Sequence, residues 1–452
     1  MKIIVVGDGK VGRTIVEHIC KEGHEVTIID KDSDTVDEIV NQYDVLGICG
    51  NGASYDVLKE AGADKADLIV ATTTNDETNI LSCLISEKIG TKSSVARVRS
   101  YEYNNQLKII KKDLGIDMPI NPEKETANEI TKILNFPEAL RIDSFAKGNV
   151  DLVELFIPEN NPLVGESLIS VSQKYQIKVL VCAIERGDEV FIPTGTFTLN
   201  AKDKIYVTAN SRATLRKFIE KVSLVEKRLK NVLIVGGGKI TAYLGKELEK
   251  GKFNVKVIEQ DKNRCLELSE LLPNASIICG DGTDQDLLIE EGINDMDAVV
   301  ALTNKDEENI ILSIYANQQD IQKIVTKVNK PSLVKLLNNI SLSSVISPKE
   351  VTASKILSYI RAINNSRGSS VITLYKLVNN KVEALEFKAK ENNKLINIPL
   401  KDLKIKQNIL VAAIIHDNQV IIPSGNDVIS VDDNVIIVTT NQYLKDLNEI
   451  LE

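Results

Sequence analysis

Three glycines near the start of the chain are spaced in a way that favours a phosphate-bearing ligand. Gly7, Gly9 and Gly12 form a G-x-G-x-x-G pattern between an apolar run and a segment of helical spacing. In such a turn the first glycine permits the bend, the second lets backbone amides approach a diphosphate, and the third lets helix and strand pack closely. A purely structural glycine turn is the alternative. The expected ligand contacts in this loop are Gly7, Asp8, Gly9, Lys10, Val11 and Gly12.

An acidic residue lies where the ribose of a dinucleotide would bind. Asp30 ends the second predicted strand, roughly 20 residues after the glycines, and a carboxylate at that place hydrogen-bonds ribose hydroxyls. Because the carboxylate would repel a 2′-phosphate, NAD(H) is favoured over its 2′-phosphorylated form. ATP or ADP fits the pattern equally well, and the sequence does not separate these ligands.

Loops at the carboxyl edge of the same sheet are expected to complete the site, because ligands of such sheets bind outside the strand ends. Asn51 follows the third predicted strand, and Thr73 and Thr74 follow the fourth. Arg97 lies at the end of the fifth, where it is placed to meet a phosphate. An ordinary charge at the sheet edge is the alternative interpretation of Arg97.

The whole chain is two copies of one larger-plus-smaller arrangement. The glycine turn recurs as three consecutive glycines, but Thr241 stands in place of the third glycine of the pattern. Lys327 likewise replaces the arginine. These departures leave open whether the second copy binds a ligand or is a degenerate structural copy. Its candidate residues are Gly236, Gly237, Gly238, Lys239, Ile240, Glu259, Thr303 and Lys327.

The elements that must position these residues follow from the alternation of the sequence. In each larger unit, five short apolar runs alternate with segments of helical spacing, which predicts a doubly wound parallel sheet. Each smaller unit has short strands, tight turns and one candidate helix. The predicted fold class is α/β, with two Rossmann domains, each followed by a small α+β domain. The expected boundaries are 1–140, 141–225, 226–365 and 366–452.

Composition excludes several classes of function. The 452 residues carry a net charge of −9 and no basic domain, which argues against a nucleic-acid partner. No apolar run approaches the roughly 18 residues that suggest a membrane-spanning helix, so no membrane insertion is expected. The six cysteines form no C-x-x-C pair and predict neither a metal site nor a disulfide framework. We expect them to be buried thiols in a reducing cytoplasm.

The sequence offers no catalytic constellation. Its three histidines are His18, His24 and His416, and none is expected at a carboxyl edge or recurs in the other copy. No Gly-x-Ser-x-Gly, H-E-x-x-H or Walker pattern is present. We therefore predict sensing and no catalytic residue. An NAD-dependent oxidoreductase and a nucleotide-binding subunit of another transport assembly are the alternative hypotheses.

Together these residues resemble the RCK (regulator of K⁺ conductance) family, above all the TrkA-type peripheral regulatory subunits of Trk potassium uptake. The resemblance covers essentially the whole chain and rests on the glycine turn together with segments 50–52, 60–64, 76–79 and 96–99. It implies a homo-oligomeric cytoplasmic ring of RCK domains on the inner face of the membrane, docked beneath a membrane-embedded Trk potassium channel subunit. NAD(H), ATP or ADP would change the ring and so the channel. In the family the nucleotide contacts positions that match Gly7 to Val11, Asp30, Thr73, Thr74 and Arg97.

The resemblance also implies assembly through a helix that follows the last strand of each larger domain. Segments 123–134 and 349–363 are amphipathic and follow prolines, so they could cross between subunits. Covering their own sheets is the alternative. Some relatives bind cyclic di-AMP in their small domains, and nothing in 141–225 or 366–452 decides that question. The number of subunits and the activating nucleotide also stay open.

Overall fold

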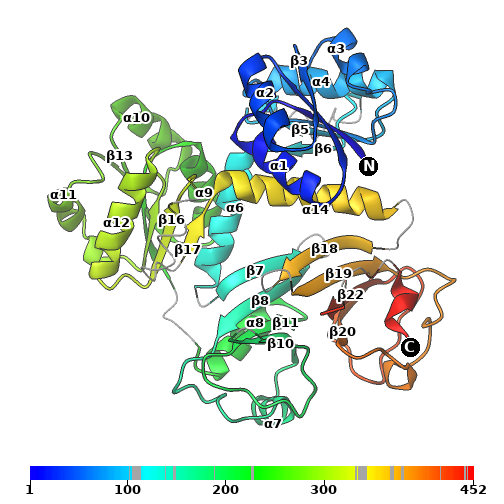
Figure 1. The fold of residues 1–452 in the computed structure, drawn as a ribbon. Coiled ribbons are helices and arrows are strands. Elements are labelled where there is room, and N and C mark those ends of the chain that lie inside the picture. The colour runs from blue at the N-terminus through cyan, green and yellow to red at the C-terminus, as the bar shows by residue number, and fades with distance from the viewer. Residues whose placement is uncertain are drawn as a thin grey trace. The chain divides into compact units, whose positions relative to one another are not determined.

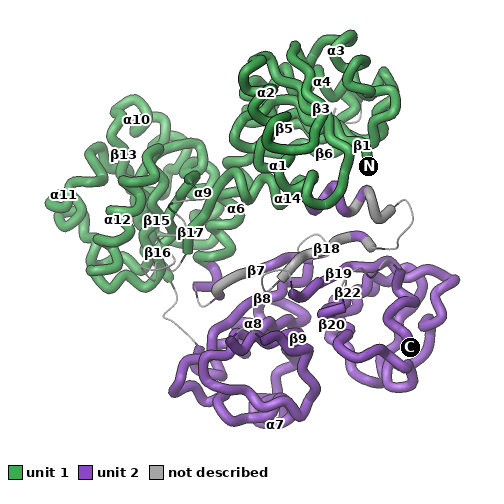
Figure 2. Tube along the Cα trace, viewed as in Figure 1, with its two compact units in different colours: residues 1–134, 229–357 green, residues 135–228, 358–452 purple. Residues whose placement is uncertain are grey.

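The structure, a computed structural model, forms two compact units that each draw on both halves of the sequence (Figures 1 and 2). Unit 1 comprises residues 1–134 and 229–357, and unit 2 comprises 135–228 and 358–452. Unit 1 therefore holds the two larger copies and unit 2 the two smaller ones. The structure describes residues 1–100, 102–103, 113–137, 139–145, 149–187, 189–224, 229–330, 333, 344–366, 371–377, 381–417, 419–441, 444 and 446–452.

The first larger copy is a six-stranded parallel sheet with a helix between each pair of successive strands from β1 to β5. Its strand order is β3-β2-β1-β4-β5-β6, the Rossmann order of a doubly wound sheet. The elements are β1 (Lys2–Val6), α1 (Lys10–Lys21), β2 (Glu25–Asp30), α2 (Ser33–Gln42), β3 (Leu46–Cys49), α3 (Tyr55–Glu60), β4 (Leu68–Ala71), α4 (Asp76–Ile89), β5 (Ser94–Arg97), β6 (Met118–Ile120) and α6 (Pro122–Asn135).

The second larger copy repeats this topology, with strand order β14-β13-β12-β15-β16-β17, again parallel throughout. The predicted fold class is thus confirmed. The elements are β12 (Asn231–Val235), α9 (Lys239–Lys250), β13 (Asn254–Glu259), α10 (Lys262–Leu271), β14 (Ser276–Cys279), α11 (Gln285–Glu290), η2 (Ile293–Asp295), β15 (Ala298–Ala301), α12 (Asp306–Gln318), β16 (Lys323–Lys327), β17 (Ser344–Ile346) and α14 (Pro348–Ser366).

The register of the central strands brings the predicted ligand loops to one edge. β1 is buried over Ile3–Val6 because helices cover both faces of the sheet. Val6 pairs with Ile29 of β2 and with Ala71 of β4. The strand order reverses between β1 and β4, and in such folds the ligand crevice lies at this point. The residues that follow these three strands therefore meet at one carboxyl edge.

Two features of the larger copies were not foreseen. A sixth strand, β6, extends the first sheet, although only five were expected. Helix α6 does not cover its own sheet: Ala127, Ile130 and Leu134 pack in one apolar cluster with Val232 and Leu244 of the second copy. The amphipathic face of α6 thus crosses between the two larger copies of the same chain.

The smaller copies are antiparallel five-stranded sheets, with orders β10-β9-β11-β8-β7 and β18-β19-β22-β20-β21. The first carries two α-helices where one was expected, and the second has a 3-10 helix, η3 (Leu400–Asp402), in place of its expected α-helix. The boundaries between the four domains remain a prediction. The elements are β7 (Ala139–Phe145), β8 (Val150–Phe156), α7 (Leu168–Tyr175), β9 (Val179–Arg186), β10 (Glu189–Phe191), β11 (Lys204–Ala209), α8 (Arg212–Lys221), β18 (Val371–Leu377), β19 (Val382–Lys388), η3 (Leu400–Asp402), β20 (Ile409–His416), β21 (Gln419–Ile421), β22 (Asn434–Thr439) and η4 (Leu447–Ile450).

Candidate nucleotide-binding sites

The glycine turn joins β1 to α1 and leaves the amino end of the helix open. Gly7 has φ of +95°, and a Cβ on it would lie 2.9 Å from the backbone nitrogen of Thr73. A Cβ on Gly12 would lie 1.9 Å from the carbonyl oxygen of Gly7. By contrast, nothing lies within 4 Å of the Cβ position of Gly9, and no side chain caps α1. The uncapped amides and the open space beside Gly9 therefore fit an anionic group.

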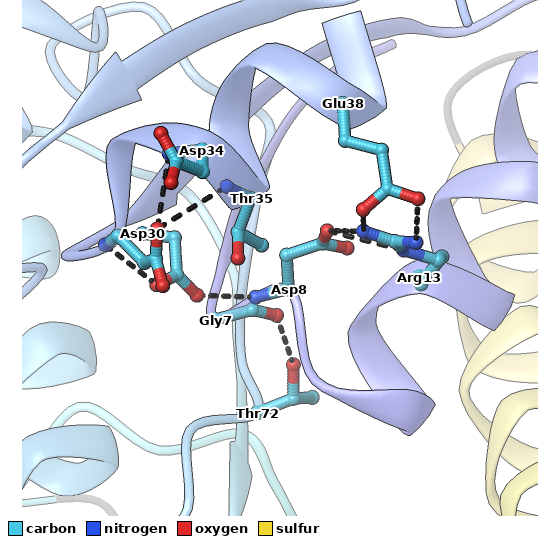
Figure 3. Close-up of polar contacts among 9 residues, drawn as sticks. Gly7, Asp8, Arg13, Asp30, Asp34, Thr35, Glu38 and Thr72 are labelled. Carbon is cyan, nitrogen blue, oxygen red and sulfur yellow. Dashed lines mark hydrogen bonds and ion pairs between the residues drawn. The ribbon is translucent and has the colours of Figure 1, made fainter. Parts of the chain in front are cut away.

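Asp30 is turned back onto the glycine turn (Figure 3). Its Oδ2 accepts a hydrogen bond from the backbone N–H of Asp8 at 2.7 Å, and its Oδ1 accepts one from the N–H of Asp32 at 3.1 Å. Each carboxylate oxygen has a further lone pair. The carboxylate is thus held in a fixed position and can still accept hydrogen bonds from ribose hydroxyls.

Arg13, which no sequence pattern indicated, connects the turn to α2. Its guanidinium donates to Asp8 Oδ2 at 2.7 and 3.2 Å and to the two carboxylate oxygens of Glu38 at 3.0 Å each (Figure 3). The Asp8 side chain is buried, and its other oxygen has no hydrogen-bond partner. Burial raises the pKa of Asp8, and Arg13 opposes that shift. No repeat could have revealed Arg13, because Ala242 occupies its place in the second copy.

Asn79 connects the loops that follow β4 and β5. It is fully buried on α4, and its Oδ1 accepts from the Thr73 N–H at 2.8 Å and the Thr73 hydroxyl at 2.7 Å. Its Nδ2 donates to the carbonyl oxygens of Thr73 at 3.1 Å and Arg97 at 2.8 Å. Asn309 makes the matching backbone contacts in the second copy. The recurrence of this asparagine was visible in the sequence, but its structural role was not.

Arg97 ends β5 with part of its hydrogen-bonding capacity unused. Its Nη1 donates to the Thr73 carbonyl oxygen at 3.1 Å, whereas its buried Nε has no hydrogen-bond partner. Burial lowers the pKa of Arg97. Buried donors are rarely left without a partner, so the free Nε fits a site that receives an anion such as a phosphate.

The other predicted residues of the first site lie at the same edge without forming its hydrogen-bonded core. Asn51 follows β3, and its carboxamide oxygen accepts from the Ala53 N–H at 3.2 Å, which stabilises its own turn. Thr74 is exposed beyond β4. Lys10 and Val11 begin α1, the first exposed and the second buried. Any role of these four residues in binding would therefore be a direct contact with the ligand.

The second copy preserves the acid-to-turn contact. Gly236 has φ of +104°, and a Cβ on it would lie 2.8 Å from the backbone nitrogen of Thr303, the residue that follows Leu302 beyond β15. Glu259 ends β13, accepts from the N–H of Gly237 through Oε2, and accepts from the N–H of Asp261 at 2.8 Å through Oε1. The longer glutamate thus makes the same two backbone contacts as Asp30.

Around this contact the second site departs from the first. The Thr241 hydroxyl donates to the Gly236 carbonyl oxygen. Arg264 of α10 donates to the carbonyl oxygens of Gly237 at 2.6 Å and Gly238 at 3.3 Å. Lys327 is buried, which lowers its pKa, and its Nζ donates to a backbone carbonyl oxygen at 3.3 Å. An arginine again fixes the turn, but it comes from a different helix. The remaining candidates, Lys239 and Ile240, begin α9.

A cavity of about 550 Å³ lies in unit 2, between α7 and segment 406–410. Most of the side chains that line the cavity are aliphatic, for example those of Ile169, Val171 and Ile409. Lys406 is the one charged residue among the described residues of this lining. A single lysine is a poor match for the negative charges of a diphosphate. We therefore place the candidate nucleotide sites at the sheet edges of unit 1.

The fold and these edges define a tandem of two Rossmann domains with small antiparallel companion domains. The TrkA-N domain family matches residues 3–122 and 232–348, and the TrkA-C domain family matches residues 152–222 and 384–452. The chain belongs to the TrkA family of Trk system potassium uptake proteins. In the part of the chain that the structure describes, no helix has the length and apolar character needed to cross a membrane.

Relatives and solved structures resemble the chain over nearly its full length. The Trk system potassium uptake protein TrkA of Vibrio alginolyticus is 33% identical over 460 residues, which span 100% of this chain and 99% of that protein. TrkA homolog 2 of Methanosarcina mazei is 32% identical and covers 100% of both. The GsuK channel bound to NAD superposes with a TM-score of 0.64 at 15% identity, covering 98% of this chain and 77% of its own. That likeness establishes a shared fold.

Proposed function

We propose that this chain is a nucleotide-sensing regulatory subunit that assembles beneath a Trk-type membrane channel and gates potassium uptake. The observation that carries the proposal is the edge of the first sheet, where Asp30 is fixed on the glycine turn beside an uncapped α1 and the free Nε of Arg97. The potassium-uptake relatives support it, as does GsuK, a channel of the same fold that has been solved with NAD and with ADP.

The ligand that we propose for the first site is NAD(H) or an adenine nucleotide such as ATP or ADP. The diphosphate would lie on the α1 amides beside Gly9, and the ribose would hydrogen-bond to Asp30. Arg97 would meet a phosphate oxygen. The Asp30 carboxylate disfavours a 2′-phosphate by charge repulsion. The second site would bind the same class of ligand with different affinity, because Thr241 and Arg264 alter its turn.

Regulation fits the chain better than catalytic turnover, because its histidines lie away from the carboxyl edges. His18, in the last turn of α1, is 3.8 Å from Glu350, and His24 precedes β2 at the opposite edge of the sheet. His416 ends β20 and bonds Asp433 at 2.6 Å. We propose that the chain acts in the cytoplasm as a homo-oligomeric ring on the inner membrane face. A nucleotide would bias this ring through different affinities for two conformations.

Potassium flux through a reconstituted Trk channel tests this function. Proteoliposomes that contain the channel subunit and the wild-type chain should show flux that differs at least threefold between saturating ATP, ADP and NADH. Asp30→Ala should remove most of that difference, because the ribose loses its acceptor. Asp37→Ala is the matched control: it removes the same charge from an exposed site on α2 and should respond like wild type. Flux that responds to no nucleotide while the chain is bound would refute the proposal.

A further inference from the structure

Two cysteines of the second larger copy lie together beside the residue that would bind ribose. Cys265 is in the first turn of α10, and Cys279 ends β14, where it pairs in register with Glu259. The Cys265 thiol donates to the Glu259 carbonyl oxygen at 3.3 Å, and the Cys279 thiol donates to the next carbonyl oxygen, that of Gln260, at 3.9 Å. The two thiols thus lie against adjacent carbonyl oxygens, on two elements that pack together, and this placement suits a disulfide.

The pair combines an accessible thiol with a sheltered one. Cys279 is exposed, whereas Cys265 is 8% exposed. The expectation that all six cysteines are buried is thus wrong for Cys279, for Cys49, its counterpart in the first copy, and for Cys20, which is half-buried. Cys49 makes the same type of contact, to the Lys31 carbonyl oxygen at 3.5 Å, but Val36 stands where Cys265 would be. The first copy therefore provides an internal control.

We propose that Cys265 and Cys279 form a reversible disulfide when the protein meets a peroxide. The Cys279 thiolate attacks one peroxide oxygen, the O–O bond breaks, and the leaving hydroxide takes a proton to become water. The resulting sulfenic acid is attacked by the Cys265 sulfur, the S–O bond breaks, and a second water leaves. Two thiols lose two electrons and two protons, and hydrogen peroxide becomes two waters. A dithiol reductant reverses the reaction.

The surroundings of the pair set the order of these steps. The pKa of Cys265 is raised to about 11, chiefly by burial and in smaller part by the neighbouring Cys279 thiol and the carboxylates of Glu259 and Asp261. Cys265 is therefore protonated and sheltered while Cys279 meets the oxidant. Once Cys279 is a sulfenic acid its sulfur is electrophilic, and Cys265 loses its proton as it attacks that sulfur. Such transient disulfides are the kind found in a reducing compartment.

The disulfide would act on the second nucleotide site, an effect that rests on the proposed function. Arg264, which holds the glycine turn through Gly237 and Gly238, directly precedes Cys265. The Cys265 thiol itself contacts the backbone of Glu259. Tying the first turn of α10 to the end of β14 removes that thiol contact and moves Arg264 with it. Oxidation should therefore change nucleotide affinity at the second site and leave the first unchanged.

Peptide mapping under hydrogen peroxide tests the disulfide without any nucleotide. A glutamyl endopeptidase cuts at Glu267 and Glu270, between the two cysteines, so a disulfide appears as two joined peptides that a reductant separates. We expect this species in wild type and in Cys49→Ser. In Cys265→Ser it should be replaced by a sulfenic acid on Cys279 that dimedone traps. Val36→Cys should create a second linked pair with Cys49. Unlinked peptides in oxidised wild type, with the two thiols modified independently, would overturn the proposal.

The coupling to the nucleotide site has its own readout. Titration of oxidised and reduced protein with ATP and NADH should show at least a threefold change in Kd at the second site. The Cys265→Ser/Cys279→Ser double variant should show no change after the same treatment. Equal affinities in a protein whose disulfide has been verified would overturn the coupling alone. Absence of binding in either state would count against the proposed function and leave the disulfide standing.

Discussion

Gly12→Ala is expected to abolish nucleotide binding at the first site and to lower the free energy of unfolding by about 2 kcal/mol. The new Cβ would lie 1.9 Å from the Gly7 carbonyl oxygen and 3.0 Å from the Thr72 hydroxyl, so α1 must move away from β1. Overpacking costs about 1–3 kcal/mol, and the 1.9 Å approach places this substitution at the upper end of that range, from which the better helix propensity of alanine offsets about 1 kcal/mol. Urea unfolding and calorimetric titration with ATP and NADH measure the two effects.

Gly9→Ala separates the ligand effect from the folding effect. Nothing lies within 4 Å of its Cβ position, and its φ of −71° suits alanine, so unfolding should match wild type. The methyl group would occupy the space assigned to the diphosphate and should weaken binding at least tenfold, about 1.4 kcal/mol. A Gly12→Ala protein with wild-type stability and affinity would contradict the described packing. A Gly9→Ala protein with wild-type affinity would contradict the described ligand position.

Asn79→Ala is expected to lower the free energy of unfolding by about 3 kcal/mol, because it removes four hydrogen bonds of a fully buried side chain, three of them to partly buried backbone groups. The Thr73 N–H loses its acceptor and the Arg97 carbonyl oxygen loses the Asn79 donor, while the Thr73 carbonyl oxygen keeps only Arg97 Nη1. The loops after β4 and β5 would then separate, and affinity for ATP or NADH at the first site should fall. Urea unfolding and calorimetric titration are the measurements.

Asn309→Ala is the matched control for that substitution. It removes the same backbone contacts in the second copy, to Thr303 and to the Lys327 carbonyl oxygen. We expect a similar loss of stability and unchanged affinity at the first site. A loss below about 0.5 kcal/mol for Asn79→Ala would mean that surrounding groups or water replace these bonds, contrary to their burial.

Much of the fold could be predicted because strong local patterns specify it. A buried run such as 2–6, followed by a glycine turn and then by an acid at the end of the next strand, is typical of the carboxyl edge of a Rossmann sheet. The internal repeat shows this pattern twice. β6 was missed because three residues, one of them Pro119, carry no periodicity. The surface against which α6 packs could not be predicted either, because an amphipathic face shows that a helix packs against something but does not identify its partner.

The candidate site could be predicted at its glycines and its acid but not in its supporting contacts. Gly7 and Asp30 are constrained by backbone geometry and by strand register, which sequence patterns reveal. Arg13 and Arg264 lie on helix surfaces, where an arginine is usually a solvated charge, and neither has a counterpart in the other copy. Asn79 did recur, but its four hydrogen bonds depend on tertiary contacts between α4, β4 and β5.

The most direct test of nucleotide sensing is calorimetric titration of the full chain with NADH, NAD⁺, ATP and ADP, repeated with Asp30→Ala and with Glu259→Ala. We predict saturable binding of at least one of these ligands, a Kd at the first site that Asp30→Ala raises at least tenfold, and no effect of Glu259→Ala at that site. Absence of binding by all four ligands, or an Asp30→Ala protein that binds as tightly as wild type, would contradict the assignment of the first glycine turn as the sensing site.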